Sequence, residues 1–138
     1  MKVSIGCDKA GIQLKNFIIE SLKNEFDFID LGTNSDEAVD YPDYAKKVAK
    51  TILNKEADFG ILLCGTGIGM SIAANKFKGI RASLCHNSLE AKLTREHNDA
   101  NILCLGARII GQEIALENVK VFLATKFSNE ERHIRRIN

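Results

Sequence analysis

The sequence has almost no net charge, no long hydrophobic run and no closely spaced cysteine pair, and each absence excludes a class of protein. Its 19 Lys and Arg and 18 Asp and Glu leave a formal net charge of +1, too small for the positive field that nucleic-acid binding uses. No apolar stretch approaches the roughly 20 residues that a membrane helix needs. Asp8 and Lys9 follow Met1 too soon for the apolar core of a secretory signal. We therefore expect a cytoplasmic globular protein without a nucleic-acid or membrane partner.

The cysteines are spread too widely for a metal ribbon or a redox pair. The chain has four of them, Cys7, Cys64, Cys85 and Cys104, and the closest two are 19 positions apart. Without a CxxC pair, a zinc ribbon or a thioredoxin-type site is not expected, and no other cluster of metal ligands is visible. A free cysteine is most often a small buried hydrophobe, so a second feature is needed to single one out.

Two glycine-containing segments have partial nucleotide-binding patterns but lack a required residue. The segment Gly65–Met70 lacks the third glycine of the dinucleotide fingerprint, and the next predicted strand ends in Cys85-His86-Asn87 without an acid for the ribose. The segment Gly6–Gly11 has P-loop spacing, but Ile12 stands where lysine is required. We expect neither nucleotide nor any other cofactor.

Short apolar segments alternate with amphipathic ones along the whole chain. The apolar segments predict five strands, at residues 3–7, 28–31, 59–63, 80–85 and 102–105. The segments between them predict helices, one of which has Pro42 in its first turn, and a short basic helix ends the chain. Alternation of strands and helices is typical of a parallel sheet covered by helices on both faces. No composition break or repeat divides the chain, so we expect one domain over residues 1–138.

One cysteine stands at the end of a predicted strand and directly before a glycine-rich turn. The sequence Cys64-Gly65-Thr66-Gly67-Ile68-Gly69 follows the strand at 59–63 and precedes a helix predicted at 70–76. Backbone N–H groups in such a turn bind anions and favour a thiolate beside them. This segment therefore predicts chemistry on a substrate that develops negative charge, with Cys64 as a base.

Further polar residues follow the other strands, and each has a purely structural alternative. Asp8 comes directly after the first strand, where it either faces a ligand or caps the first helix. His97 suits proton transfer near neutral pH but is also ordinary on a surface. Asp99 has a possible site role and an equally ordinary role in a turn.

Two arginines near the C-terminus are placed to hold an anion. Arg132 and Arg136 stand four positions apart, so they share one face of a helix and repel each other. An anion that bridges them would turn this repulsion into charge-assisted hydrogen bonds. A solvated basic tail is the alternative. Arg108 and Lys9 can supplement the same anion, for which phosphate is the best fit. The residues thus favour catalysis on a phosphorylated small molecule.

Seven motifs, which occur in order over nearly the whole chain, resemble type B ribose-5-phosphate isomerase. They are Gly6-Cys7-Asp8, Asp40-Tyr41-Pro42, Cys64–Gly69, Ala73-Ala74-Asn75-Lys76, Gly79-Ile80-Arg81-Ala82, Arg95–Asn101 and Arg132-His133. The wider family also contains galactose-6-phosphate and allose-6-phosphate isomerases. The resemblance implies a Rossmann-like three-layer α/β/α sandwich with a five-stranded parallel sheet. It also implies a metal-free and cofactor-free aldose–ketose isomerase that interconverts ribose 5-phosphate and ribulose 5-phosphate. Its dimers have active sites built from both subunits, and a tetramer is the alternative assembly.

The resemblance assigns the proton-transfer roles to four side chains and one loop. Cys64 matches the base that moves a proton between C2 and C1, and Thr66 would shuttle protons between O1 and O2. His97, with Asp8 nearby, would open the furanose ring. The backbone N–H groups of the glycine loop, Gly65, Gly67, Ile68 and Gly69, would stabilise the enediolate.

The resemblance assigns the remaining residues to substrate binding. Tyr41 and Asn98 would position sugar oxygens, while Arg108, Arg132 and Arg136 would hold the phosphate. His97 and Arg108 come late in the sheet order, and they are expected to serve the partner subunit's pocket. The site is therefore expected to be complete only in a dimer.

One residue departs from the ribose enzymes and leaves the sugar open. Lys9 stands where they have a histidine that contacts phosphate, and lysine binds phosphate as a point charge. One subunit type of the galactose-6-phosphate isomerases resembles this Asp-Lys-Ala-Gly segment but lacks the cysteine–glycine loop, so the pentose is favoured over a six-carbon sugar phosphate. A non-catalytic sugar-phosphate sensor is the alternative from another class. A sensor needs the arginines but neither Cys64 nor His97, and detection of ketose separates the two.

Overall fold

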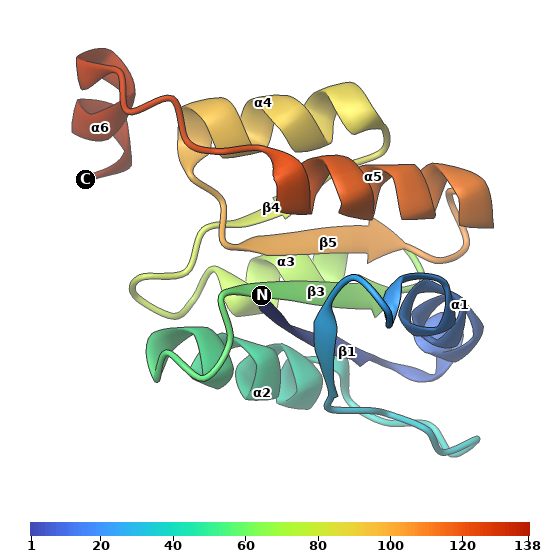
Figure 1. Cartoon of the computed structure of the whole chain (residues 1–138). Helices are drawn as coiled ribbons and strands as arrows, with labels where there is room; N and C mark the ends of the chain where they lie inside the picture. Colours follow the sequence, from blue (N-terminus) through green and yellow to red (C-terminus); the bar gives the residue numbers. More distant parts are fainter.

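The computed structural model describes residues 1–138. Five strands form one parallel sheet in the order β2-β1-β3-β5-β4, which confirms the predicted number and direction of strands (Figure 1). The strands are β1 (Lys2–Cys7), β2 (Asp27–Asp30), β3 (Phe59–Cys64), β4 (Ala82–Leu84) and β5 (Ile102–Gly106).

Strand β4 is shorter than the predicted segment 80–85. At its start, hydrogen bonds to two asparagine side chains replace hydrogen bonds to a neighbouring strand. The backbone N–H of Arg81 donates to Asn101 Oδ1 at 2.8 Å, and the N–H of Ala82 donates to Asn75 Oδ1 at 2.8 Å. Both asparagines lie outside β4 in sequence, so nothing local to the segment marks where its pairing begins.

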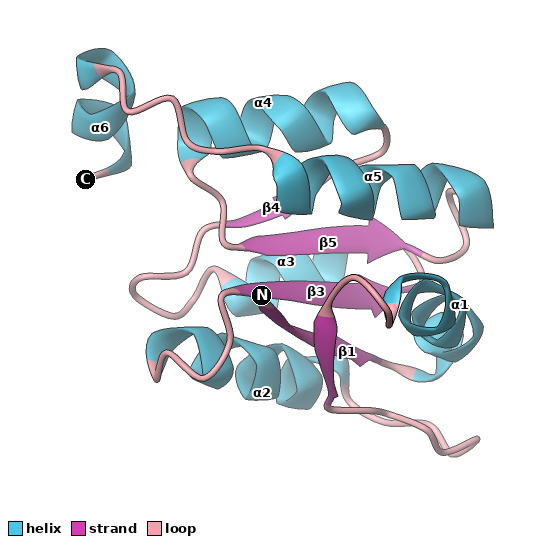
Figure 2. Ribbon diagram, viewed as in Figure 1, coloured by secondary structure: helices cyan, strands magenta, loops and turns pink.

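Helices cover both faces of the sheet, which confirms the three-layer sandwich (Figure 2). Helices α1 (Ile12–Leu22), α4 (Ser88–Asn98) and α5 (Gln112–Ala124) pack on one face. Helices α2 (Tyr41–Leu53) and α3 (Ile68–Ala74) pack on the other. A short helix, α6 (Glu131–Ile137), packs against α4. None of these helices has the length and hydrophobicity to cross a membrane.

The apolar pattern of the central strands explains the two layers. In β3, Ile61 and Leu63 are fully buried against α1 and α5, while Leu62 is fully buried on the α2–α3 side. A strand that is buried on both faces reads as a continuous apolar run, as in the sequence. Cys64 falls on the same face as Leu62 and packs in the core below α3.

The order of the strands creates a crevice at one edge of the sheet. The chain leaves β1 toward β2 on one side and later reaches β3 on the other side of β1. At such a reversal the connections diverge beyond the carboxyl ends of the strands, where ligands bind in open α/β sheets. Asp8 follows β1 and Cys64 ends β3, so the crevice lies between these two residues.

A buried lysine holds the segment after β2 in place. The side chain of Lys15 on α1 is fully buried, and its Nζ donates to both carboxylate oxygens of Asp30 at 2.9 Å and to Asn34 Oδ1 at 2.7 Å. Asp30 Oδ1 also accepts the N–H of Gly32 at 2.9 Å. The backbone N–H of Cys7 in turn donates to Gly32 O at 2.7 Å. The ion pair thereby supports the end of β1, beside Asp8.

We predict that removal of the Asp30 charge destabilises the protein more than removal of the Lys15 charge. Asp30→Asn leaves a buried ammonium without its counter-charge and should lower the free energy of unfolding by about 3 kcal/mol. Lys15→Met should lower it by about half as much, because the Asp30 side chain is 35% exposed and water can solvate the carboxylate. Urea unfolding of both variants measures the difference. A larger loss in Lys15→Met would contradict this assignment.

Candidate active site

The segment 64–69 forms a tight turn in which the backbone faces the cysteine sulfur. The N–H of Gly67 donates to Cys64 Sγ at 3.2 Å, and the N–H of Ile68 donates to Thr66 Oγ1 at 3.2 Å. A donor aimed at the sulfur stabilises negative charge on it. Cys64 is 6% exposed, so its sulfur lies at the boundary between the core and the crevice.

Three further N–H groups of this turn have no partner within the chain. The N–H groups of Gly65, Thr66 and Gly69 donate to no backbone or side-chain acceptor of the protein. Unpaired backbone donors at a strand-to-helix turn form an anion site. The turn therefore presents a sulfur and three free donors in one place.

The glycine at position 67 is required by the path of the backbone. Gly67 has φ +79°, in the left-handed region, and a Cβ there would lie 2.5 Å from Leu84 Cδ1 and 2.9 Å from the carbonyl carbon of Leu105. Both the conformation and the close approach exclude other residues. The turn is thus seated directly against β4 and β5.

Arg108 lies beside the cysteine turn of its own chain. The N–H of Ala107 donates to Cys64 O at 2.8 Å, and the N–H of Arg108 donates to Gly65 O at 2.9 Å. The Arg108 side chain lies over Gly65, where an added Cβ would be 3.3 Å from Nη1. The reason is the pairing of β3 with β5, which brings Gly106 opposite Cys64.

Asp8, Lys9 and Tyr41 also come to this edge of the sheet. The N–H of Asp8 donates to Leu63 O at 3.2 Å, and Asp8 Oδ1 accepts the N–H of Ala10 at 3.0 Å. Asp8 therefore caps the turn Lys9–Gly11, which confirms its predicted capping role. Tyr41 begins α2, and its ring packs on Gly69, where an added Cβ would lie 2.8 Å from Cζ.

His97, Asn98, Arg132 and Arg136 form a second group at the opposite edge. Helix α4 starts beyond the carboxyl end of β4 and ends before the amino end of β5, so His97 and Asn98 in its last turn lie at the amino edge (Figure 1). Helix α6, which carries both arginines, packs beside this end of α4. Within one chain, His97 is therefore not near Asp8 or Cys64. The last turn of α4 is one helix length, roughly 16 Å, away from the carboxyl edge of the sheet.

The second group is exposed and carries positive charge. Arg132 and Arg136 are both exposed, and Arg132 Nη1 pairs with Glu130 Oε2. Asn98 and His97 are also exposed. These side chains are available to a molecule that approaches the amino edge from outside.

Asp99 has a structural role that explains its position in the motif. It ends α4 with φ +46°, and its Oδ1 accepts Arg95 Nη1 at 2.8 Å. Arg81 Nε donates to the carbonyls of Asn98 at 3.1 Å and Asp99 at 2.9 Å. Arg95 is buried, and its guanidinium lies over the Phe59 ring at 4.7 Å. These arginines fix the end of α4 and hence the backbone that carries His97 and Asn98.

Sequence reasoning gave no role to His133, which contacts His97 directly. The two ring centroids are 4.5 Å apart, and His133 is 4% exposed although it lies in a polar helix. The only signal in the sequence was its place in the Arg132-His133 motif. A lone histidine between arginines gives no local indication of burial.

The other three cysteines lie in the core and are poor nucleophiles. Burial raises the pKa of Cys7 to about 11, with smaller opposing effects from Lys15 and a backbone hydrogen bond of Thr33. Burial also raises the pKa of Cys85 and of Cys104. Their thiols stay protonated near neutral pH, which agrees with a packing role.

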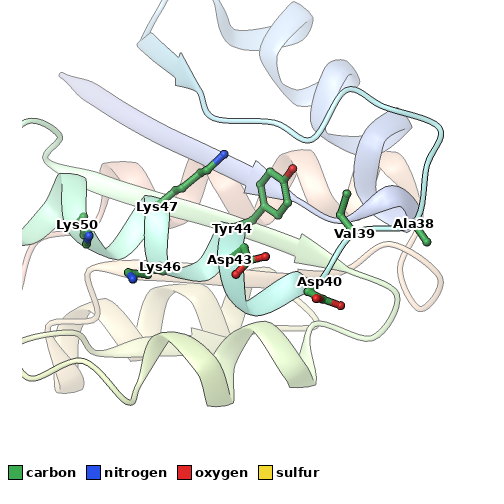
Figure 3. A pocket seen from close by; sticks show the side chains of 8 residues that line it. All are labelled: Ala38, Val39, Asp40, Asp43, Tyr44, Lys46, Lys47 and Lys50. Atoms are coloured by element: carbon green, nitrogen blue, oxygen red, sulfur yellow. The ribbon is translucent and has the colours of Figure 1, made fainter.

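The cavities of a single chain do not coincide with either group of residues. The largest, of about 630 Å³, lies between the start of α2 and the preceding loop, with Lys47 and Tyr44 on one side and Asp40 and Asp43 near the helix start (Figure 3). Of the residues with a predicted site role, only Asp99 lines one of the four cavities, beside Arg81 and Arg95. No group of three or more His, Cys, Asp or Glu side chains is arranged to hold a metal ion.

The chain matches known sugar-phosphate isomerases over nearly its whole length. The family model described as Ribose/Galactose Isomerase matches residues 3–138. Ribose-5-phosphate isomerase B of Escherichia coli is 45% identical over 137 residues, which cover 99% of this chain and 91% of that protein. A putative sugar phosphate isomerase of Bacillus subtilis is 50% identical over 139 residues, covering 99% and 93%.

Solved structures agree with the fold. The crystal structure of a ribose 5-phosphate isomerase from Thermotoga maritima superposes with a TM-score of 0.96 at 54% identity, covering 99% of this chain and 94% of that one. Type B ribose 5-phosphate isomerase from Trypanosoma brucei superposes with a TM-score of 0.95 at 47% identity, covering 99% and 93%.

We predict that only one thiol of the native protein reacts rapidly with a thiol reagent near neutral pH. Cys64 retains 6% exposure and has a hydrogen-bond donor at its sulfur, whereas burial covers the other three cysteines and raises the pKa of their thiols. Mass spectrometry after a short exposure should find one modified cysteine, and Cys64→Ala should abolish that rapid phase. Rapid modification of Cys7, Cys85 or Cys104 in the native state would contradict the assignment.

Proposed function

The chain belongs to the ribose/galactose isomerase family, and we propose that it interconverts ribose 5-phosphate and ribulose 5-phosphate. The names of the relatives from Escherichia coli and Thermotoga maritima support this substrate. The observation that carries the proposal is the turn at 64–69, where Cys64 Sγ and three unpaired N–H groups lie together at the reversal in strand order. An aldose–ketose isomerase needs this combination of a base and an anion site.

Proton transfer is the step that the cysteine turn supports. The Cys64 thiolate removes the proton from C2 of the open-chain sugar and returns it to C1. Negative charge develops on the substrate oxygens in the enediolate between these steps. The free N–H groups of Gly65, Thr66 and Gly69 are placed to stabilise it as an oxyanion hole. Thr66 Oγ1 moves the hydroxyl proton between O1 and O2.

Ring opening and substrate binding use the remaining polar residues. His97 acts as the acid–base group that opens the furanose ring, together with Asp8. Tyr41 and Asn98 position the sugar hydroxyls. Lys9, Arg108, Arg132 and Arg136 bind the phosphate by charge-assisted hydrogen bonds. All of this chemistry uses protein groups, so we propose that the reaction needs neither metal nor cofactor. We also propose that the enzyme works in the cytoplasm.

A site that draws on both groups requires two chains. His97 and Cys64 lie at opposite edges of the sheet in one chain, and no cavity of the chain contains either. We propose a homodimer in which His97, Asn98, Arg132 and Arg136 of one subunit complete the cysteine crevice of the other. Arg108 acts within its own subunit, in contrast to the sequence expectation. A tetramer of two such dimers is the alternative assembly.

Exposed apolar side chains support an interface beside the edge strand β4. Ile68 and Ile72 on α3 and Leu89 on α4 are each more than half exposed. Helix α3 precedes β4 and helix α4 follows it, and the two helices pack on opposite faces of the sheet. The outer edge of β4 pairs with no other strand. Burial of such side chains between two copies would remove them from water. The interface would also bring the last turn of α4 toward the partner.

The identity of the sugar depends on the pocket around Lys9. The pentose is favoured by the names of the relatives, while Lys9 is the residue that keeps a six-carbon sugar 6-phosphate as the alternative. A longer sugar must place its phosphate one carbon further from C1 and C2. The kcat/KM for ribose 5-phosphate should therefore exceed the values for allose 6-phosphate and galactose 6-phosphate.

We predict that the purified protein converts ribose 5-phosphate to ketose and that Cys64→Ala abolishes this turnover. Loss of the base should lower kcat by at least about a hundredfold. Binding of the sugar phosphate should stay nearly normal, because the base acts in the transition state. Ketose formation and calorimetric binding measure the two quantities.

A matched cysteine variant and a chelator complete this test. Cys104→Ala should keep most of its activity, because the Cys104 side chain is fully buried in the core and does not reach the substrate, although its stability should fall. EDTA should leave kcat unchanged. Normal kcat in Cys64→Ala would remove this residue from the mechanism, and failure of the wild-type protein to form ketose would contradict the proposed function.

A further inference from the structure

His133 is a buried histidine in contact with the residue to which ring opening is assigned. It is the one buried residue of α6, at 4% exposure, and its ring centroid lies 4.5 Å from that of His97 with the planes tilted by 39°. Its neighbours Arg132 and Arg136 are exposed. Because the His133 ring is covered, it does not reach the substrate and its role must be exerted through His97.

A serine ties this histidine to the last turn of α4. Ser128 Oγ lies 2.7 Å from His133 Nδ1 and also accepts the N–H of Glu130 at 3.2 Å. The backbone N–H of Ser128 donates to the carbonyl of Glu96 at 3.1 Å. Glu96 directly precedes His97, so the contacts form a closed path from α4 through Ser128 to His133 and back to the His97 ring.

The environment of His133 keeps its ring neutral. Burial lowers the pKa of His133, and the nearby Arg132, His97 and Arg136 lower it further, against an opposing effect of Glu130. A neutral ring packs against His97 without repelling a proton that His97 carries during acid–base catalysis. His97 itself is exposed and has no hydrogen bond within the chain that would orient its ring.

We propose that His133, held by Ser128, is a positioning residue that orients the imidazole of His97 for opening the furanose ring. This inference rests on the proposed function, because it assumes that His97 acts on the cyclic sugar. Catalytic acids and bases work best when neighbouring groups restrict their rotamers. Here the restriction comes from ring packing on one side and leaves the other side of His97 open to the partner subunit's crevice.

Exchange of hydrogen with the solvent separates ring opening from proton transfer. Ribose 5-phosphate is cyclic and must be opened before C2 can lose its proton. Ribulose 5-phosphate is open-chain, because its C5 oxygen carries the phosphate and cannot close a furanose ring on C2. The base can therefore remove a C1 hydrogen of ribulose 5-phosphate and return one from the solvent without any ring step. A defect confined to ring opening lowers kcat/KM equally in both directions, because the equilibrium constant is fixed, but it spares this exchange.

The test measures kcat/KM in both directions, and the exchange of the C1 hydrogen of ribulose 5-phosphate with deuterated water, for His133→Ala. His97→Asn is the reference and Arg135→Ala is the control on the same helix. His133→Ala should lower kcat/KM about tenfold in both directions, a part of the hundredfold or more that acid–base catalysis supplies. Its rate of hydrogen exchange should change by less than about twofold. His97→Asn should show the same difference between interconversion and exchange more strongly, and Arg135→Ala should match the wild type.

A second variant covers the case in which His133→Ala does not fold. Ser128→Ala removes one hydroxyl and should give the same pattern, weaker than in His133→Ala. A parallel loss of hydrogen exchange and interconversion, or no loss in a folded variant, would overturn the role of His133. If the wild type forms ketose but His97→Asn lowers exchange and interconversion in parallel, the ring-opening role of His97 fails and this inference fails with it. A wild type inactive in both directions would contradict the proposed function itself.

Discussion

A parallel sheet places every strand end at one edge and every strand start at the other, and this constraint determines how the chemistry is divided. Asp8, Cys64 and Arg108 follow three central strands, so they gather at the carboxyl edge. His97 ends a helix that runs back to the amino edge, and α6 with its arginines packs there. The cysteine turn and the exposed group of His97, Asn98, Arg132 and Arg136 therefore lie at opposite edges of one chain, and we propose that a second chain brings them together.

The cysteine turn depends on close packing as much as on its own residues. Gly67 fits against β4 and β5 only because it has no side chain, and this contact aims its N–H at Cys64 Sγ. The unpaired donors at Gly65 and Gly69 are consequences of the same tight path. A rigid backbone site of this kind stabilises charge without reorganisation during the reaction. In the proposed mechanism, backbone groups thus stabilise the charge, while side chains move the protons.

The sequence was sufficient for the elements whose signals are local. Continuous apolar runs predicted all five strands, and Pro42 marked the start of α2. The turn after Cys64 was recognisable from its glycines alone. Features that depend on distant partners were not predictable in this way. The start of β4 is set by Asn75 and Asn101. The position of Arg108 beside Gly65 of its own chain was not predicted, because only the register of β5 against β3 brings it there.

The central claim, that each active site is built from two chains, is tested most directly by mixing two defective subunits. Cys64→Ala and His97→Ala chains, each nearly inactive on ribose 5-phosphate, are co-expressed, and mass spectrometry confirms the mixed dimers. Random pairing makes about half of the dimers mixed, and each mixed dimer has one intact site if the site is shared. If the sites are shared, roughly a quarter of wild-type turnover should be recovered. Persistent inactivity with confirmed mixed dimers would contradict it.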